Sequence, residues 1–204
     1  MGGRHANQTS KPHRRPKGDV ADAILDAAIA LAEEADWEKV RLRIVAERIG
    51  CSLADVGEHY RDLDQVADAW FGRARMAMLA PFPKDFPGRP AEERVFIVMM
   101  RWFDALAAHR VVTCDMLKAK IYPSHPHHWV PLVFNLSRII QWVREAALLD
   151  STQRRRQVEE IGLTGLFVLT LGVWRRDDTP GQKKTRQFLH QRLHSCDRLM
   201  TFLF

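Results

Sequence analysis

Residues 41–61 contain the side chains best suited to contact a nucleic acid. Arg43 and Arg61 could neutralise phosphates. Asp55 and Glu58 could accept hydrogen bonds from cytosine amino groups. Residues 52–59 contain no Arg, Lys, Asn or Gln, the residue types that make bidentate contacts to guanine or adenine. The segment therefore carries candidate DNA contacts, but its acidic composition does not favour binding to a polyanion.

Four helices are expected to position these residues. The apolar spacing predicts a first helix from Asp19, a second over 41–49, a third over 52–59 and a fourth over 62–79. Gly50 can end the second helix in a left-handed conformation. Ser52-x-x-Asp55 and Asp62-x-x-Gln65 are possible caps for the helices that follow. Two short helices after a longer one are typical of a helix-turn-helix.

The detailed order resembles the TetR family of one-component regulators. The matching positions are Ile24-Leu25-Asp26-Ala27-Ala28, Ala46-Glu47-Arg48, Gly50, Ser52, Tyr60 and Val66. The resemblance implies that the third helix enters the major groove and that residues around its junction with the fourth hold phosphates. The DNA-contacting set that it implies is Arg43, Ser52, Leu53, Ala54, Asp55, Glu58, His59, Tyr60 and Arg61. The chain departs from the family pattern at Arg41, Ile44, Gly57, His59 and Leu63.

Charge divides the chain into three parts, which we take as its domains. Residues 1–18, predicted to be a disordered arm, carry five basic residues and no acidic one. Residues 19–72, called the head below, carry 13 acidic against five basic residues, a net charge of −8. Residues 73–204, called the body, carry 21 basic against 12 acidic residues, a net charge of +9. The arm could follow a minor groove and partly offset the acidic head.

The body also reads as helices, so the predicted fold class is all-α. A segment rich in Pro and Gly, 81–90, separates it from the head. No period-2 strand pattern occurs. The expected helices span about 92–109, 112–121, 130–149, 152–175 and 182–203. The family resemblance implies that this part binds a ligand and forms a homodimer. Gly165 and Gly172, seven residues apart, would lie on one helix face and allow a second helix to approach.

Apolar side chains of the body could line a cavity for a small apolar ligand. The residues are Met99, Trp102, Phe103, Met116, Trp142, Phe167 and Trp174. Packing in an ordinary core would produce the same set.

The last helix offers a second interpretation. Its apolar stripe, which includes Leu189, Leu193 and Met200, is flanked by basic residues, so 182–204 could contact an anionic membrane surface. Packing on the body or on a second subunit is the alternative. The segment from Asp178 to Leu193 also resembles the ubiquinone-biosynthesis accessory family, which is TetR-like in fold and binds lipids. The alternative function is therefore a lipid- or isoprenoid-binding protein with a non-functional head.

Other classes of function find little support. The sequence has no GxSxG motif, no phosphate-binding Gly-rich loop and no nucleophile beside a base, so we expect no enzyme and no cofactor. His125, His127 and His128 lack partner ligands, and we expect no metal site. Cys51, Cys114 and Cys196 are odd in number and far apart. This cysteine pattern does not suggest disulfide bonds. No apolar run reaches the ~18 residues of a membrane span, so we expect a cytoplasmic protein. The leading expectation is a ligand-responsive DNA-binding regulator.

Overall fold

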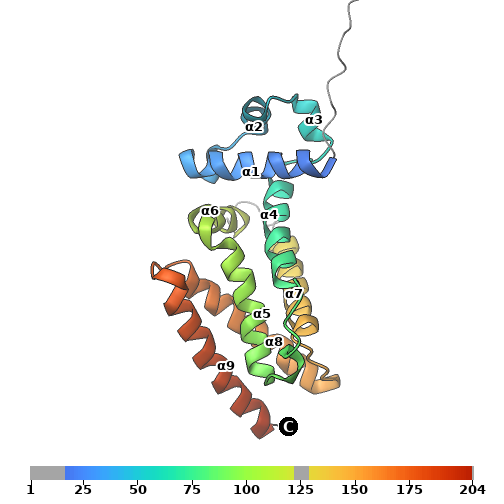
Figure 1. Ribbon diagram of the computed structural model, residues 1–204, viewed down its shortest axis with the longest axis vertical. Coiled ribbons are helices and arrows are strands. Elements are labelled where there is room, and N and C mark those ends of the chain that lie inside the picture. Colours follow the sequence, from blue (N-terminus) through green and yellow to red (C-terminus); the bar gives the residue numbers. More distant parts are fainter. Residues whose placement is uncertain (1–16, 122–128, 204) are drawn as a thin grey trace, which may run out of the picture.

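The computed structural model describes residues 17–121 and 129–203, and the secondary structure in these ranges is entirely helical. The molecule is elongated (Figure 1). Three helices form the head at one end, and one long helix descends from them into a bundle. The expected all-α fold class is confirmed.

The head comprises α1 (Lys17–Ala35), α2 (Leu42–Ile49) and α3 (Leu53–Gly57). The predicted start of α1 at Asp19 is two residues late, so Asp19 lies inside the helix and cannot cap it. Trp37, in a single 3-10 turn after α1, is 5% exposed and fills the small core of the head. Val45 and Val56 are fully buried beside it and bring α2 and α3 onto α1.

Gly50 makes the tight bend between α2 and α3. Its φ of 70° is left-handed, a conformation that glycine adopts without the cost that a Cβ would add. The next amide, that of Cys51, donates back to the Ala46 carbonyl at 3.0 Å. This pattern satisfies a carbonyl that the end of the helix would otherwise leave unpaired. The predicted helix end at Gly50 is confirmed.

Helix α4 (Leu63–Met78) connects the head to the body. Its cap is Asp62, whose carboxylate accepts from the Gln65 amide at 2.8 Å. Residue 72, the predicted end of the head, lies inside this continuous helix. Arg73 also donates to Asp22 at 2.7 Å and to Asp26, so α4 is tied to α1.

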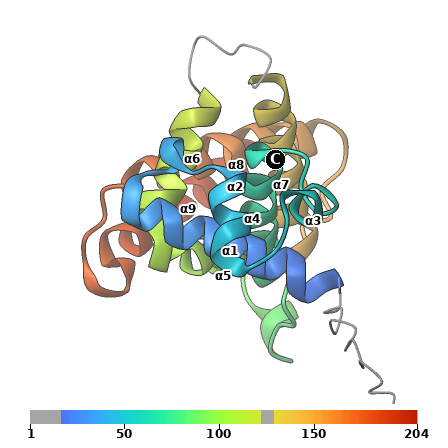
Figure 2. The same cartoon turned by 90° about the horizontal axis from the view of Figure 1, so that it is seen from above.

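The body contains α5 (Ala91–Leu106), α6 (Arg110–Ile121), α7 (Trp129–Ala146), α8 (Gln153–Trp174) and α9 (Lys183–Leu203). Each falls within a few residues of its predicted range. The largest differences are three residues, at the ends of α5 and α7. After α5, Ala107–His109 form a 3-10 turn that leads directly into α6. In Figure 2 the head lies across the top of the bundle, with α1 passing over α4 and α6.

Helix α9 packs against α8 and α5, and the described part of its apolar stripe is buried. Leu189 and Leu193 are 0% and 7% exposed, as expected for a stripe that faces the body. The remaining apolar residues of the stripe, from Cys196 onward, lie outside the described side chains. None of the described helices is long and apolar enough to span a membrane.

Candidate nucleic-acid interface

Ser52 and Asp55 fix the beginning of α3 through reciprocal hydrogen bonds. The Asp55 amide donates to Ser52 Oγ at 3.1 Å, and the Ser52 amide donates to Asp55 Oδ2 at 2.9 Å. Ser52 Oγ also donates to that carboxylate oxygen at 2.7 Å. The predicted capping box is therefore present, although Asp replaces the usual Glu or Gln. Both side chains already have partners within the head.

The outward side of α3 is apolar at its start. Leu53 is 55% exposed, and within residues 20–72 it is the only large hydrophobic side chain exposed to that degree. Ala54 beside it is also exposed, and Glu58 is exposed at the other end of α3. Val56 points inward and is fully buried. The structure thus brings Ser52, Leu53, Ala54, Asp55 and Glu58 to the surface around one short helix.

The two aromatic candidates after α3 differ from the rest of the set. Tyr60 is only 8% exposed, and its hydroxyl donates to the Ala21 carbonyl at 3.2 Å. Burial raises the pKa of this phenol above its ordinary value. Its side chain therefore joins α3 to α1 instead of lying on the outer surface. His59 is half-buried.

The two arginines of the predicted set lie on the segments that precede and follow α3 along the chain. Arg43 on α2 has a side chain 67% exposed and forms an ion pair with Glu47 at 3.7 Å. Arg61, just before α4, has a side chain 83% exposed and donates to Asp62 at 2.9 Å. Partial burial opposes ionisation of Asp62, but hydrogen bonds from Arg61 and the Gln65 amide outweigh it and lower the pKa. Both arginines are available to a phosphate backbone.

Sequence reasoning left Arg41 out of the DNA-contacting set. It is exposed at the N-cap of α2, where its guanidinium donates to the carbonyls of Glu38 and Val40 at 2.6 and 2.7 Å. It adds an exposed cation at the beginning of α2, the helix that carries Arg43. The sequence did contain a sign of this role. Arginine cannot accept the hydrogen bonds that Ser or Thr accepts at an N-cap, so its presence at this position indicated a function other than capping.

Polar contacts join the head to α6. Trp70 Nε1 on α4 donates to Thr113 Oγ1 at 2.9 Å, and both residues are buried. His109 Nδ1 lies 2.6 Å from Glu33 Oε1 on α1, and its ring meets the Trp70 indole edge to face. At the far end of α6, Lys120 Nζ lies 3.1 Å from Asp68 Oδ1 on α4. Helix α6 and the 3-10 turn before it therefore contact both α4 and α1.

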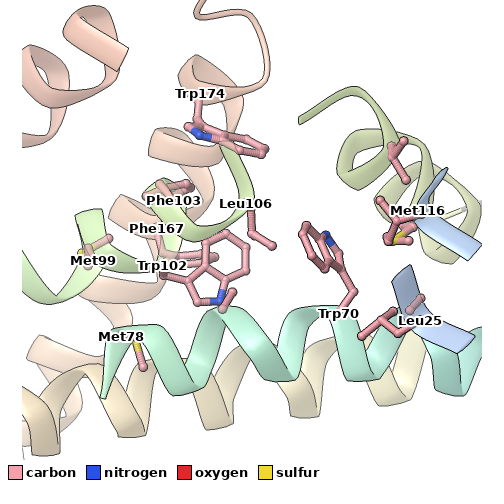
Figure 3. Close-up of a cluster of buried hydrophobic side chains, with 14 of the residues drawn as sticks. Leu25, Trp70, Met78, Met99, Trp102, Phe103, Leu106, Met116, Phe167 and Trp174 are labelled. Carbon is pink, nitrogen blue, oxygen red and sulfur yellow. The ribbon is translucent and has the colours of Figure 1, made fainter. Parts of the chain in front are cut away.

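Five of the seven candidate ligand residues lie together in the body core (Figure 3). Met99, Trp102, Phe103, Phe167 and Trp174 are each 3% exposed or less. The Trp102 ring lies 5.2 Å from Phe103 and 5.0 Å from Phe167, centroid to centroid. Trp102 Nε1 is buried and has no hydrogen-bond partner among the described residues.

The other two candidates lie elsewhere. Met116 is fully buried, but Figure 3 places it on α6 beside Leu25 and Trp70, across from the Trp102 group. Trp142 is 44% exposed on α7. The apolar spacing could not separate these sites, because it identifies a helix face without identifying the partner of that face.

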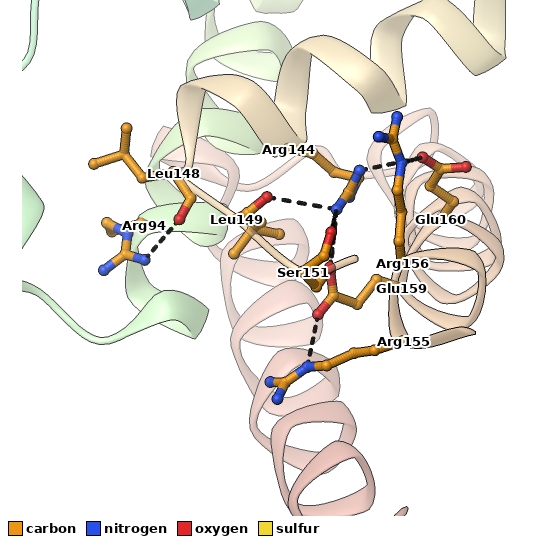
Figure 4. Close-up of polar contacts among 9 residues, drawn as sticks. All are labelled: Arg94, Arg144, Leu148, Leu149, Ser151, Arg155, Arg156, Glu159 and Glu160. Carbon is orange, nitrogen blue, oxygen red and sulfur yellow. Dashed lines mark hydrogen bonds and ion pairs between the residues drawn. The ribbon is translucent and has the colours of Figure 1, made fainter. Parts of the chain in front are cut away.

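A buried arginine joins α7 to α8 (Figure 4). Arg144 is 3% exposed, and its guanidinium lies 3.2 Å from Glu160 and 3.4 Å from Glu159. It also donates to Ser151 Oγ at 2.9 Å in the turn between the two helices. Arg155 and Arg156 pair with the same carboxylates from the exposed side. This network fixes the crossing of α7 and α8.

One face of α8 is apolar and exposed. Ile161, Val168 and Leu169 are 75%, 48% and 59% exposed, and Val158 is 38% exposed. Gly162, Gly165 and Gly172 lie exposed among them, with no heavy atom within 4 Å of a Cβ built at any of the three. The described part of the chain contains no other helix with as many large apolar side chains exposed.

The described residues include no group of His, Cys, Asp and Glu able to hold a metal ion. The predicted absence of a metal site is untested at His125, His127 and His128, which lie outside the described residues.

No protein-family profile and no curated protein sequence matches the chain. Solved structures do. The TetR transcriptional regulator from Nitrosomonas europaea ATCC 19718 is 38% identical over 87% of this chain and 97% of its own, with a TM-score of 0.77. A TetR transcriptional regulator from Rhodococcus sp. RHA1 is 17% identical, with coverages of 89% and 96% and a TM-score of 0.62. A transcriptional regulator from the same strain is 16% identical, with coverages of 86% and 94% and a TM-score of 0.52. These two show the fold alone.

The helix-turn-helix head on an all-helical body defines a class of regulatory proteins. With 38% identity over nearly the whole of a solved member, the chain belongs to the TetR family of transcriptional regulators. The resemblance stated from the head alone is therefore confirmed. The alternative of a lipid-binding accessory protein receives no support from these comparisons.

Proposed function

We propose that this TetR-family regulator binds operator DNA by placing α3 in the major groove, with Arg43 and Arg61 on the phosphates at either side. The observation that carries the proposal is the geometry of the head. A capped helix with its first residues exposed follows a tight turn at Gly50, and the segments before and after it in the chain each carry an exposed arginine. In helix-turn-helix proteins the second helix of the motif, here α3, contacts base edges with its N-terminal residues.

The acidic composition of the head sets the strength of this binding. Neutralisation of phosphates supplies most of the sequence-independent affinity for DNA. The head offers Arg41, Arg43 and Arg61 for that purpose, and the basic residues of 1–18 can add to them. Its carboxylates oppose the approach of a polyanion, although Asp62 and Glu47 are paired with Arg61 and Arg43. We expect weak non-specific binding that declines steeply with salt.

The experiment measures the affinity of the purified chain for duplexes enriched from a randomised library at low salt. Arg61→Ala and Arg43→Ala should each weaken binding to all sequences. Each should also reduce the slope of log affinity against log salt by about 0.9. Arg155→Ala removes an arginine of the body that is 54% exposed on α8 and should leave both quantities unchanged. If no duplex is bound at low salt, DNA binding by this chain is excluded.

The same proposal includes a homodimer formed through the apolar face of α8. A contiguous exposed apolar surface favours contact with another protein, and exposed glycines let a helix of the second copy approach closely. In a two-fold dimer the same surface serves both copies. Two heads then bind two half-sites, and their separation must match the operator.

Ligand response is the finer part of the proposal. A small apolar molecule that separates the packed rings around Trp102 would shift α5 and α8, and through α6 and α4 the spacing of the heads. The unpaired Trp102 N–H favours a ligand that carries a hydrogen-bond acceptor. Native mass spectrometry of the protein purified from cells tests for a bound small molecule. Such a regulator would act in the cytoplasm, where its DNA lies.

A further inference from the structure

The exposed start of α3 identifies what this head can recognise in a base pair. The inference rests on the proposed DNA binding, so its test must distinguish failure of the specific base contact from failure of DNA binding. Residues 52–59 include no side chain able to make a bidentate contact to a purine edge. The polar side-chain atoms of Ser52 and Asp55 also hydrogen-bond within the capping box. The most prominent feature of the reading surface is an apolar one, Leu53.

We propose that Leu53 determines specificity by packing against the C5 methyl group of a thymine in each half-site. The thymine methyl is the apolar group that normal base pairs present in the major groove. Leu53 is 55% exposed at the first position of α3, the part of a recognition helix that lies nearest the bases. Ala54, next to it, is small enough not to keep a base edge away.

Burial explains why such a contact would be retained. A large apolar side chain on the surface of a small head gains nothing from the head's own core, since Val56 on the opposite side of α3 already fills that role. Contact with a methyl group removes apolar surface of both partners from water. Removal of one buried methyl weakens such a contact by about four-fold. The loss of affinity caused by one missing thymine methyl is therefore modest. When the methyl is missing from both half-sites, the logarithm of that loss doubles.

The test starts from a duplex enriched from a randomised library by the purified chain. Deoxyuridine then replaces thymidine at each position of the half-sites, one position at a time, which deletes only the methyl group. We expect one position per half-site at which the replacement weakens binding by about four-fold. Leu53→Ala should weaken binding to the thymidine duplex, and in this variant deoxyuridine at that position should have no further effect.

Met76→Ala provides the matched control, because Met76 is a 64% exposed apolar side chain on α4, outside α3. This variant should keep the full deoxyuridine effect. The proposal for Leu53 fails if enriched duplexes share no thymine in their half-sites. It also fails if deoxyuridine is tolerated everywhere, or if Leu53→Ala leaves the deoxyuridine effect intact. A chain that enriches no duplex at all overturns the proposed DNA binding itself. Thermal unfolding of Leu53→Ala should match the parent, because the residue is exposed.

Discussion

Trp70 on α4 donates a 2.9 Å hydrogen bond to the hydroxyl of Thr113 on α6, and this bond is buried. Thr113 Oγ1 donates in turn to the His109 carbonyl at 2.8 Å. The indole of Trp70 thereby connects the helix that carries the head to the helix that crosses beneath it. A movement of α6 relative to the body must either carry α4 with it or break this bond.

Thr113→Val tests the contribution of that bond. Valine keeps the shape of threonine but leaves the buried Trp70 N–H without an acceptor, which costs about 1–3 kcal/mol of unfolding free energy. Urea denaturation monitored by circular dichroism measures the loss. Thr113→Ser keeps the hydroxyl and should retain most of the stability. Equal stability of the valine variant and the parent would contradict this account of the α4–α6 contact.

Arg144→Ala should destabilise the fold by about 3–5 kcal/mol, because it leaves the carboxylates of Glu159 and Glu160 without their buried partner. Arg155→Ala is the matched control. Arg155 pairs with the same Glu159, but its side chain is 54% exposed, and its loss should cost at most about 1 kcal/mol. Chemical denaturation compares the two. Similar losses of unfolding free energy in both variants would show that the burial of Arg144 does not strengthen its contribution to stability.

Asp177 gives the fold a defined dependence on acid. Its carboxylate is fully buried between α8 and α9, where it accepts from the amides of Thr179 and Thr185 at 3.0 and 2.8 Å and from their hydroxyls. Burial opposes ionisation, but these four hydrogen bonds outweigh it and hold the pKa well below the usual range.

The direction of the pH effect follows from that lowered pKa. The ionised carboxylate stabilises the folded chain above the unfolded pKa of about 4, and this contribution is lost as the pH falls toward the folded pKa. Asp177→Asn should therefore cost about 2 kcal/mol at pH 7. The difference in unfolding free energy between the variant and the parent should become smaller below pH ~4. Denaturation curves at several pH values measure it, with Asp178→Asn, at an exposed neighbour paired with Lys184, as the control. A difference independent of pH would contradict this account.

The apolar face of α8 predicts how the proposed dimer responds to an added charge. Ile161→Glu places a carboxylate in the proposed seam, where two copies would face each other, and should shift the chain toward monomers. Sedimentation velocity measures the distribution. Val111→Glu introduces the same charge at a residue that is also 75% exposed, but on α6, and should leave the distribution unchanged. An Ile161→Glu chain that associates like the parent would place the dimer interface elsewhere.

The sequence by itself determined the helices and the family of the head. Caps and ends depend on residues within a few positions of one another, as at Ser52–Asp55, Asp62–Gln65 and Gly50, so local chemistry was enough to place them. The apolar spacing of 24–71 likewise fixed which side of each helix faces inward. The start of α1 was predicted two residues late, at Asp19, because Asp is a favoured N-cap residue and the local pattern does not exclude a helix that begins earlier.

Only the tertiary structure decided which partner each inward face meets. Tyr60 reaches Ala21 across 39 residues of sequence, Trp70 reaches Thr113 across 43, and His109 reaches Glu33 across 76. Helical periodicity carries no information about such distant neighbours. It could not tell that Tyr60 is buried or that Trp142 is exposed. Those outcomes depend on how the helices pack, since packing determines which surfaces lose contact with water.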